Sequence, residues 1–208
     1  MKAALSPRQK EELPAKPNAK PVIAGARVFL RLPKPEDAGE WVRLRQVSRA
    51  HLRPTEPAAL RGVDPFGLSG FERMLASAST ERSLRLLICL RKSNDIVGQV
   101  SLTDISRGCF QSCYVGYWIG RPFAGQGLMS EALALALRYA FVALGLHRVE
   151  ANIMPSNAPS RAVAARCGLR CEGRARRLLR LAGRWRDHER WAITVEDWRP
   201  QDKRARPT

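Results

Sequence analysis

Apolar residues along the chain change their spacing several times, and each spacing predicts one kind of element. From Arg27 to Leu32 charged and apolar side chains alternate, which is typical of a half-buried strand. From Leu128 to Val142 apolar residues recur every three or four positions, which predicts one face of a helix that Gly145 can terminate. The remaining patterns predict, in chain order, a helix from Pro35 to near Arg49, a long loop from Pro54 to Gly70, a short helix around Phe71 to Ser79, a hairpin of strands Leu84 to Arg91 and Ile96 to Thr103, strands Tyr114 to Ile119 and Val149 to Ile153, a helix from Asn157 to Gly168, and strands Leu178 to Leu181 and Trp191 to Val195.

This succession of strands and helices, in 208 residues with 45% apolar content, predicts one domain of mixed α/β (α+β) class around a single core. We expect the domain over residues 27–200, between a disordered basic leader at 1–26 and a basic tail at 201–208. The longest apolar tract, Ala132 to Leu146, contains Arg138 and is shorter than the roughly 20 residues of a membrane span. The leader also lacks the apolar core of a secretory signal. We therefore expect a cytoplasmic protein without a membrane partner.

The cysteines agree with a reducing compartment, because their number is odd and their spacing fits no disulfide framework. Two pairs are separated by three residues, which leaves a four-thiolate zinc site as an alternative. Neither pair has the two-residue spacing of a zinc knuckle, and free cysteine often serves as a small buried apolar residue. We expect no metal. The five are Cys89, Cys109, Cys113, Cys167 and Cys171.

The net charge of +17 narrows the classes of partner. Eight arginines fall between Arg170 and Arg190, against three carboxylates. A positive field of this size attracts RNA or the phosphates of a coenzyme. The alternative is that the arginines only solvate the surface.

A glycine-containing segment, Gly120 to Leu128, stands between a predicted strand and the most regular predicted helix. Gly125 and Gly127 allow the backbone to turn its N–H groups toward one point, where the helix N-terminus adds positive potential. These features predict a cradle for a pyrophosphate, with a plain glycine turn as the alternative. Ser130 replaces the third glycine of a dinucleotide fingerprint, and no Gly-Lys-Ser/Thr of a P-loop follows.

The motifs around this segment resemble those of a known family. Tyr117-Trp118-Ile119, Gly125 to Leu133, Asn157-Ala158-Pro159-Ser160 and Cys167 to Gly173 are similar to the coenzyme A motif of the GNAT acetyltransferases and stand in the right order. Together with Cys113 to Tyr117 and Gly183 to His188, they resemble the ribosomal-protein-alanine N-acetyltransferase subfamily, over about Val28 to Trp198. One departure is Pro122, where the family usually has Gln or Arg, with Arg121 one position early.

The resemblance implies the GNAT acyl-CoA N-acyltransferase fold, a mixed and mostly antiparallel twisted sheet flanked by helices. The strands at Tyr114 to Ile119 and Val149 to Ile153 are then splayed to hold acetyl-CoA, the co-substrate. Ser160 is the implied acid for the departing thiolate, although it and Asn157 also fit helix capping. The implied coenzyme-binding residues are Trp118, Ile119, Ala124, Gly125, Gln126, Gly127, Leu128, Met129 and Asn157.

The sequence leaves the general base open. Glu131 and Glu150 are the catalytic candidates beside Ser160, and Glu172 and Asp187 also stand near the motifs. Glu131 falls in the first turn of a helix, where an acid is favoured by the dipole alone. Related enzymes place a glutamate where this chain reads Leu178-Leu179-Arg180. The candidate histidines, each with an ordinary surface or packing explanation, are His51, His147 and His188.

The absence of an evident base favours an acceptor that loses its proton easily. An α-amino group has an ordinary pKa of about 7.7 to 8.0, against about 10.4 for lysine. We therefore expect direct acetyl transfer, without an acyl-cysteine, to the N-terminal alanine or serine of a ribosomal protein or ribosome-associated acceptor. The alternatives are a small amine (an amino acid, a polyamine or an antibiotic) and a coenzyme A binding or RNA-associated module without catalysis. The pattern favours no particular oligomeric state.

Overall fold

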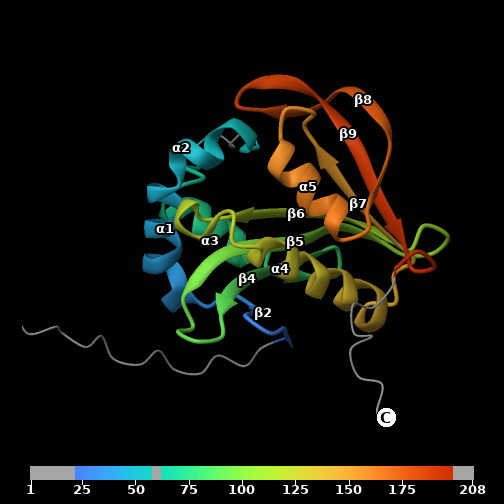
Figure 1. Cartoon of the computed structure of the whole chain (residues 1–208). Coiled ribbons are helices and arrows are strands. Elements are labelled where there is room, and N and C mark those ends of the chain that lie inside the picture. The colour runs from blue at the N-terminus through green and yellow to red at the C-terminus, as the bar shows by residue number, and fades with distance from the viewer. Residues whose placement is uncertain (1–21, 58–61, 199–208) are drawn as a thin grey trace, which may run out of the picture.

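The computed structural model describes residues 22–57 and 62–198, and in these ranges nine strands form one sheet (Figure 1). The strand order is β1-β2-β4-β5-β6-β7-β9-β8, with β3 beside β4. Every pair is antiparallel except β6 and β7. The strands are β1 Ile23–Ala24, β2 Val28–Arg31, β3 Ser79–Thr80, β4 Ser83–Leu90, β5 Ile96–Ser106, β6 Ser112–Ile119, β7 Arg148–Ile153, β8 Arg170–Leu181 and β9 Arg184–Thr194. The α-helices are α1 Ala38–Val47, α2 Arg49–Leu52, α3 Leu68–Ala76, α4 Leu128–Arg138 and α5 Ala158–Arg166.

Both faces of the central strands are covered, which explains the long apolar runs that predict them. In β4, Leu86 and Ile88 belong to the core cluster that contains the buried face of α4. The alternate residues Leu87 and Cys89 pack on the other face with Trp41 of α1 and the apolar side of α3. The mixed, mostly antiparallel sheet flanked by helices is thus confirmed. No helix in the described ranges has the length and apolar character needed to cross a bilayer.

The expected leader over residues 1–26 ends too late in the chain, because it includes a strand of the sheet. Ile23–Ala24 forms β1 and pairs with Leu30 and Phe29 of β2, because the chain turns back at Gly25, whose N–H donates to the carbonyl of Val28. Strand pairing satisfies backbone groups that the composition of this segment does not reveal. Residues 1–21 of the leader, the end of the expected domain at 199–200 and the basic tail at 201–208 lie outside the described residues.

The first helical region differs from the prediction in its bounds. A 3-10 turn, Pro35–Asp37, precedes α1, and the helix breaks at Ser48 before α2. The hydroxyl of Ser48 accepts a hydrogen bond of 2.9 Å from the N–H of Arg121, which ties this break to the segment before the glycine turn. The expected loop over 54–70 contains the start of α3 at Leu68, and α3 ends at Ala76.

The expected helix from Leu128 changes character at its end. α4 runs to Arg138, and its last turn, Tyr139–Ala143, is a π-helix before Gly145 at φ +61°. Helical periodicity therefore locates this element correctly, while the widened final turn depends on packing that the period does not encode.

The largest difference lies in the C-terminal hairpin, where only residues 178–181 and 191–195 were predicted as strands. β8 and β9 are 12 and 11 residues long and meet at Ala182 and Gly183, both at positive φ as in a type I′ turn. Their outer parts are mostly exposed and rich in arginine, so they carry no alternation of apolar residues. Figure 1 shows this hairpin arching past α5 with its tip near α2.

Candidate active site

β6 and β7 separate in the middle of the sheet. They pair only from Ser112 with Arg148 to Tyr114 with Glu150, after which β7 continues its pairing with β9 alone. A cleft of about 890 Å³ opens where the pairing stops. This volume is typical of a site for a sizeable small molecule. The expected splay of the two strands is therefore present.

The glycine turn forms one end of the cleft. Gly125 and Gly127 have φ of +77° and +75°, a conformation that other residues rarely adopt. None of the N–H groups from Gly125 to Ser130 bonds to a backbone carbonyl of the described residues. These donors stand at the N-terminus of α4, where the helix dipole is positive, and the guanidinium of Arg166 lies beside them, 2.9 Å from the hydroxyl of Ser130. The arrangement suits a pyrophosphate.

The structure brings together most of the expected coenzyme residues. Gln126 is the exception, because its side chain donates to the carbonyl of Pro122 and its own carbonyl accepts from Arg27. Gln126 therefore contributes to the turn by its backbone and does not line the cleft. The expected residues that do line the cleft are Trp118, Ile119, Ala124, Gly125, Gly127, Leu128, Met129, Asn157 and Ser160.

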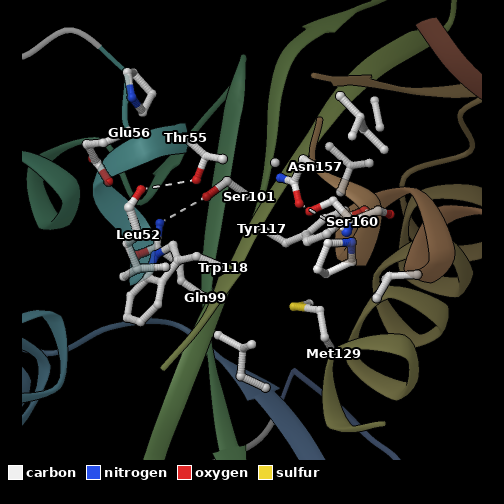
Figure 2. Close-up of a pocket in the computed structure, with 18 of the residues that line it drawn as sticks. Leu52, Thr55, Glu56, Gln99, Ser101, Tyr117, Trp118, Met129, Asn157 and Ser160 are labelled. Atoms are coloured by element: carbon white, nitrogen blue, oxygen red, sulfur yellow. Dashed lines mark hydrogen bonds between the residues drawn. The ribbon is translucent and has the colours of Figure 1, made fainter. Parts of the chain in front are cut away.

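Asn157 and Ser160 lie at the start of α5, on the same side of the cleft as Tyr117 and Met129 (Figure 2). The side chain of Asn157 accepts a hydrogen bond from the N–H of Ser160, so its capping role is present. The hydroxyl of Tyr117 donates to the carbonyl of Ser160 over 3.0 Å. Burial raises the pKa of Tyr117, which keeps this hydroxyl protonated at neutral pH. Tyr117 was part of the motif in the sequence but had no assigned role there.

Glu131 does not face the cleft. Its carboxylate accepts hydrogen bonds from the backbone N–H groups of Arg27 and Val28 and from the Arg27 guanidinium. Partial burial alone raises the pKa of Glu131, but these bonds outweigh it and lower the pKa. Glu131 thus fastens α4 to the start of β2, a role that sequence reasoning could not separate from catalysis.

The other expected acids are also held outside the cleft. Glu150 pairs with Arg148 and with Arg190, at 3.2 and 2.9 Å. Glu172 pairs with Arg148, and Asp187 accepts from Arg174 and from the N–H of Arg177. The many arginines of this chain therefore capture the carboxylates whose position near the motifs had suggested a base.

The opposite side of the cleft carries polar groups that the sequence did not assign. Gln99 and Ser101 are hydrogen-bonded to each other on β5, and Glu56 lies above them (Figure 2). His188 of β9, one of the candidate histidines, also lines the cleft; it is 1% exposed and its Nδ1 lies 3.0 Å from the carbonyl of Arg186. Burial lowers the pKa of His188 more than this contact raises it, so the imidazole is neutral at pH 7. Glu56 carries the one carboxylate among the described residues that line the cleft.

The cysteines divide into buried and exposed thiols. Cys89, Cys113 and Cys167 are buried, whereas Cys109 and Cys171 are exposed. The thiol of Cys167 donates to the carbonyl of Ser130, a residue that lines the cleft, over 3.3 Å. Burial raises the pKa of Cys167 to about 11, so the thiol is protonated and a poor nucleophile at neutral pH. The described residues contain no group of three or more side chains suited to a metal ion.

Comparison with known proteins agrees with this geometry. Residues 27–170 match the Acetyltransferase (GNAT) domain. The chain is also similar to the [Ribosomal protein uS5]-alanine N-acetyltransferase of Escherichia coli, with 43% identity over 106 residues. That match covers 51% of this chain and 55% of the relative, so the chain spans about half the length of this curated relative.

Two solved structures are similar over a larger share. The Mycobacterium smegmatis RimJ in complex with CoA-disulfide has a TM-score of 0.75 and 37% identity, and the match covers 81% of this chain and 82% of that one. The ribosomal-protein-S5-alanine acetyltransferase of Vibrio fischeri has a TM-score of 0.74 and 28% identity over 86% and 98% of the two chains.

Proposed function

Because the chain belongs to the GNAT family of acetyltransferases, we propose that it transfers the acetyl group of acetyl-CoA to the N-terminal alanine or serine of a ribosomal protein. The observation that carries this proposal is the cleft between β6 and β7, which has a ring of free backbone donors at one end and polar side chains at the other. The names of the similar proteins from E. coli and V. fischeri support the choice of acceptor. We include a cytoplasmic location in this proposal, because the proposed acceptor is ribosomal.

The chemistry needs little beyond positioning. The pyrophosphate of the coenzyme binds the N–H groups of the glycine turn, and the pantetheine arm occupies the gap between β6 and β7. A neutral amine then attacks the acetyl carbonyl directly, while backbone donors of the separated strand stabilise the oxyanion. The thiolate leaves toward Ser160 and Tyr117, whose hydroxyls are sources of a proton.

The β8–β9 hairpin supports docking on a particle that contains RNA. Five of its arginines are exposed and make no ion pair with a carboxylate of the described residues, and Trp185 beside them is 63% exposed. Guanidinium groups bind phosphates through charge and hydrogen bonds, so this contact weakens with salt. The five are Arg176, Arg177, Arg180, Arg184 and Arg186.

The test uses peptides that begin with Ala or Ser, and matched peptides whose N-terminus is blocked but which keep an internal lysine. We expect release of free coenzyme A with the open peptides only, and activity that rises with pH through about 7 to 8, where an α-amino group loses its proton. Intact masses of deacetylated ribosomal proteins after incubation identify the acceptor. Equal rates on blocked peptides contradict an N-terminal acceptor.

The same assay decides between the proposal and its two alternatives. Rapid acetylation of a polyamine or an aminoglycoside, with no peptide accepted, assigns the protein to small amines. Coenzyme A binding without turnover on any amine assigns it to non-catalytic binding. Salt separates docking from catalysis, because added salt raises the KM for ribosomal particles but leaves the KM for short neutral peptides unchanged.

A further inference from the structure

Glu56 occupies a fixed place on the wall of the cleft that faces Asn157 and Ser160 (Figure 2). It follows the 3-10 turn Arg53–Thr55, and its backbone N–H donates to the carbonyl of Arg53. On its other side, the carbonyl of Glu56 accepts from the N–H of Ala182 at the tip of the β8–β9 hairpin. Pro57 also pairs with Leu181. The segment is therefore held both by the helical layer and by the hairpin.

One oxygen of Glu56 is engaged by a buried arginine. The guanidinium of Arg45 donates to Oε2 of Glu56 over 2.6 Å and to the carbonyl of Pro65 over 2.9 Å. The side chain of Arg45 is only 4% exposed, and its guanidinium lies 4.5 Å from the ring centre of Phe66 and 4.9 Å from that of Trp118. Packing between aromatic rings holds the guanidinium still, so the carboxylate is held in one orientation.

The second oxygen of Glu56 is left for a ligand. No described residue bonds to Oε1, and the side chain keeps 21% of its surface exposed. A second side-chain acceptor nearby, the carboxamide oxygen Oε1 of Gln99, already accepts from the indole N–H of Trp41. An amine acceptor reaches the thioester as an ammonium ion at neutral pH, and an ammonium has three donors and needs negative charge.

We propose that Glu56 binds the ammonium group of the acceptor and takes its proton, so that the neutral amine attacks the thioester across the cleft. This inference rests on the proposed acetyltransferase function and names the residue that the sequence left open. The amine forms its bond to the acetyl carbon as the carbon–sulfur bond breaks, and its second proton passes to water. The thiolate gains a proton from a cleft hydroxyl, the hydroxyl takes back a proton from water, and Glu56 returns its own proton to solvent.

The surroundings of Glu56 suit this task. Burial raises the pKa of Glu56 more than the Arg45 guanidinium lowers it, which makes the carboxylate a better match for proton transfer near neutral pH. The other titratable side chains that line the cleft from the neighbouring elements are cationic or neutral: Arg45 of α1, His51 of α2, Arg73 of α3, Arg85 of β4, Tyr114 and Tyr117 of β6, Arg166 of α5 and His188 of β9. None of these supplies the negative charge that an ammonium requires.

The experiment compares E56Q with the wild type and with E72Q, which removes a carboxylate from the exposed face of α3. Glutamine keeps an oxygen that accepts from Arg45 but has no charge. For a peptide beginning with alanine, we expect E56Q to lower kcat/KM roughly 100-fold, as for loss of a general base, while its Kd for coenzyme A stays within about twofold. We also expect E56Q to keep the rise through about pH 7 to 8 that the α-amino group of the acceptor sets, but to lose the further fall of activity in more acidic solution that protonation of Glu56 causes. E72Q should behave as wild type.

The inference is overturned if E56Q keeps the kcat/KM and the pH profile of the wild type. It is also overturned if the fall of activity in acid is lost in H188Q but kept in E56Q. If E56Q no longer binds coenzyme A, E56D replaces it, since aspartate keeps the charge but shortens the reach. Reduced kcat/KM in E56D at wild-type coenzyme affinity then supports the inference, and full activity overturns it.

Failure of the proposed function gives a different result. Wild-type protein that acetylates a polyamine and no peptide refutes the ribosomal acceptor, and the Glu56 variants are then measured with the polyamine, against the same criteria. Wild-type protein without turnover on any amine overturns both proposals. An active wild type with an equally active E56Q overturns only the role of Glu56.

Discussion

The two halves of the cleft are built from different kinds of group. The coenzyme half consists of backbone N–H groups at the glycine turn and the edges of two separated strands. The half that we propose for the acceptor, called here the acceptor half, consists of side chains, among them Glu56, Gln99 and Ser101, from segments far apart in the chain. Backbone donors are supplied by any sequence that takes the right φ and ψ, whereas each side chain must be placed by packing.

This contrast explains why the first half keeps its backbone donors despite a departure from the family pattern. Pro122 replaces the usual Gln or Arg, yet the N–H groups from Gly125 to Ser130 are still free of backbone partners in the described residues. The acceptor half depends on single contacts such as that between Arg45 and Glu56. We therefore expect mutations in the coenzyme half to act through conformation, and mutations in the acceptor half to act through charge and shape.

The largest effect is expected at Gly125. Valine there is strained at φ +77° and shields the neighbouring donors, although a Cβ meets no atom within 4 Å. Loss of two charge-assisted hydrogen bonds predicts an affinity for coenzyme A lowered roughly 100-fold, measured by calorimetry. G108V is the matched control, because Gly108 has φ +67°, equally open surroundings and no place in the cleft. Equal affinity in G125V and G108V would contradict the cradle.

Gly116 allows the acceptor half to be closed without disturbing the fold. It pairs with Ser101 across β5 and β6, lines the cleft, and a Cβ there meets nothing within 4 Å. We expect G116L to lower kcat/KM for a peptide roughly 30-fold by displacing the acceptor. Gly39, on α1 and outside the cleft, is equally open, so G39L controls for the added side chain. If G116L acetylates the peptide at the wild-type rate, the acceptor does not bind beside Gly116.

The next prediction concerns the hydroxyls of Ser160 and Tyr117, toward which the coenzyme thiolate leaves in the proposed reaction. If either hydroxyl protonates the thiolate, S160A and Y117F each lower turnover roughly tenfold, since the remaining hydroxyl partly replaces the lost one. Coenzyme affinity changes less than turnover in both variants. The double variant should lose more than either single variant. Normal turnover in S160A leaves Ser160 with a role only in the helix start, where its N–H is capped by Asn157.

Glu131 should give the smallest effect on activity and a clear effect on stability. E131Q removes a carboxylate that accepts from Arg27 and Val28, and we expect a loss of about 2 kcal/mol in the free energy of unfolding with kcat unchanged. Since folding lowers the pKa of Glu131, its stabilisation is present above the unfolded value of about 4.3 and is lost as the pH falls through the folded value. Denaturation at pH 7 and at pH 3 should therefore show a difference between E131Q and wild type that shrinks in acid. A fall in the kcat of E131Q would instead indicate that Glu131 takes part in catalysis.

Patterns in the sequence located nearly all of the central elements. Apolar runs predicted β4 and β5, and helical spacing predicted α4, because both reflect burial against neighbours on known faces. The same reasoning found only the ends of β8 and β9, where exposed arginines leave no alternation to read. It also missed β1, whose pairing involves backbone groups rather than a burial pattern.

The sequence by itself determined the glycine turn that we propose as the coenzyme half of the site. Glycines at positive φ and the helix N-terminus that follows them are only a few residues apart in the chain. The order of residues is therefore enough to predict a cradle for phosphate. Only the tertiary structure decided the acceptor half. Glu131 and Glu150 stand close to the motifs but are held by arginines, while Glu56 reaches the cleft because Arg45 and the tip of a distant hairpin hold it there. A carboxylate acts through its distance and surroundings in space, and these are set by packing between segments that are far apart in the chain.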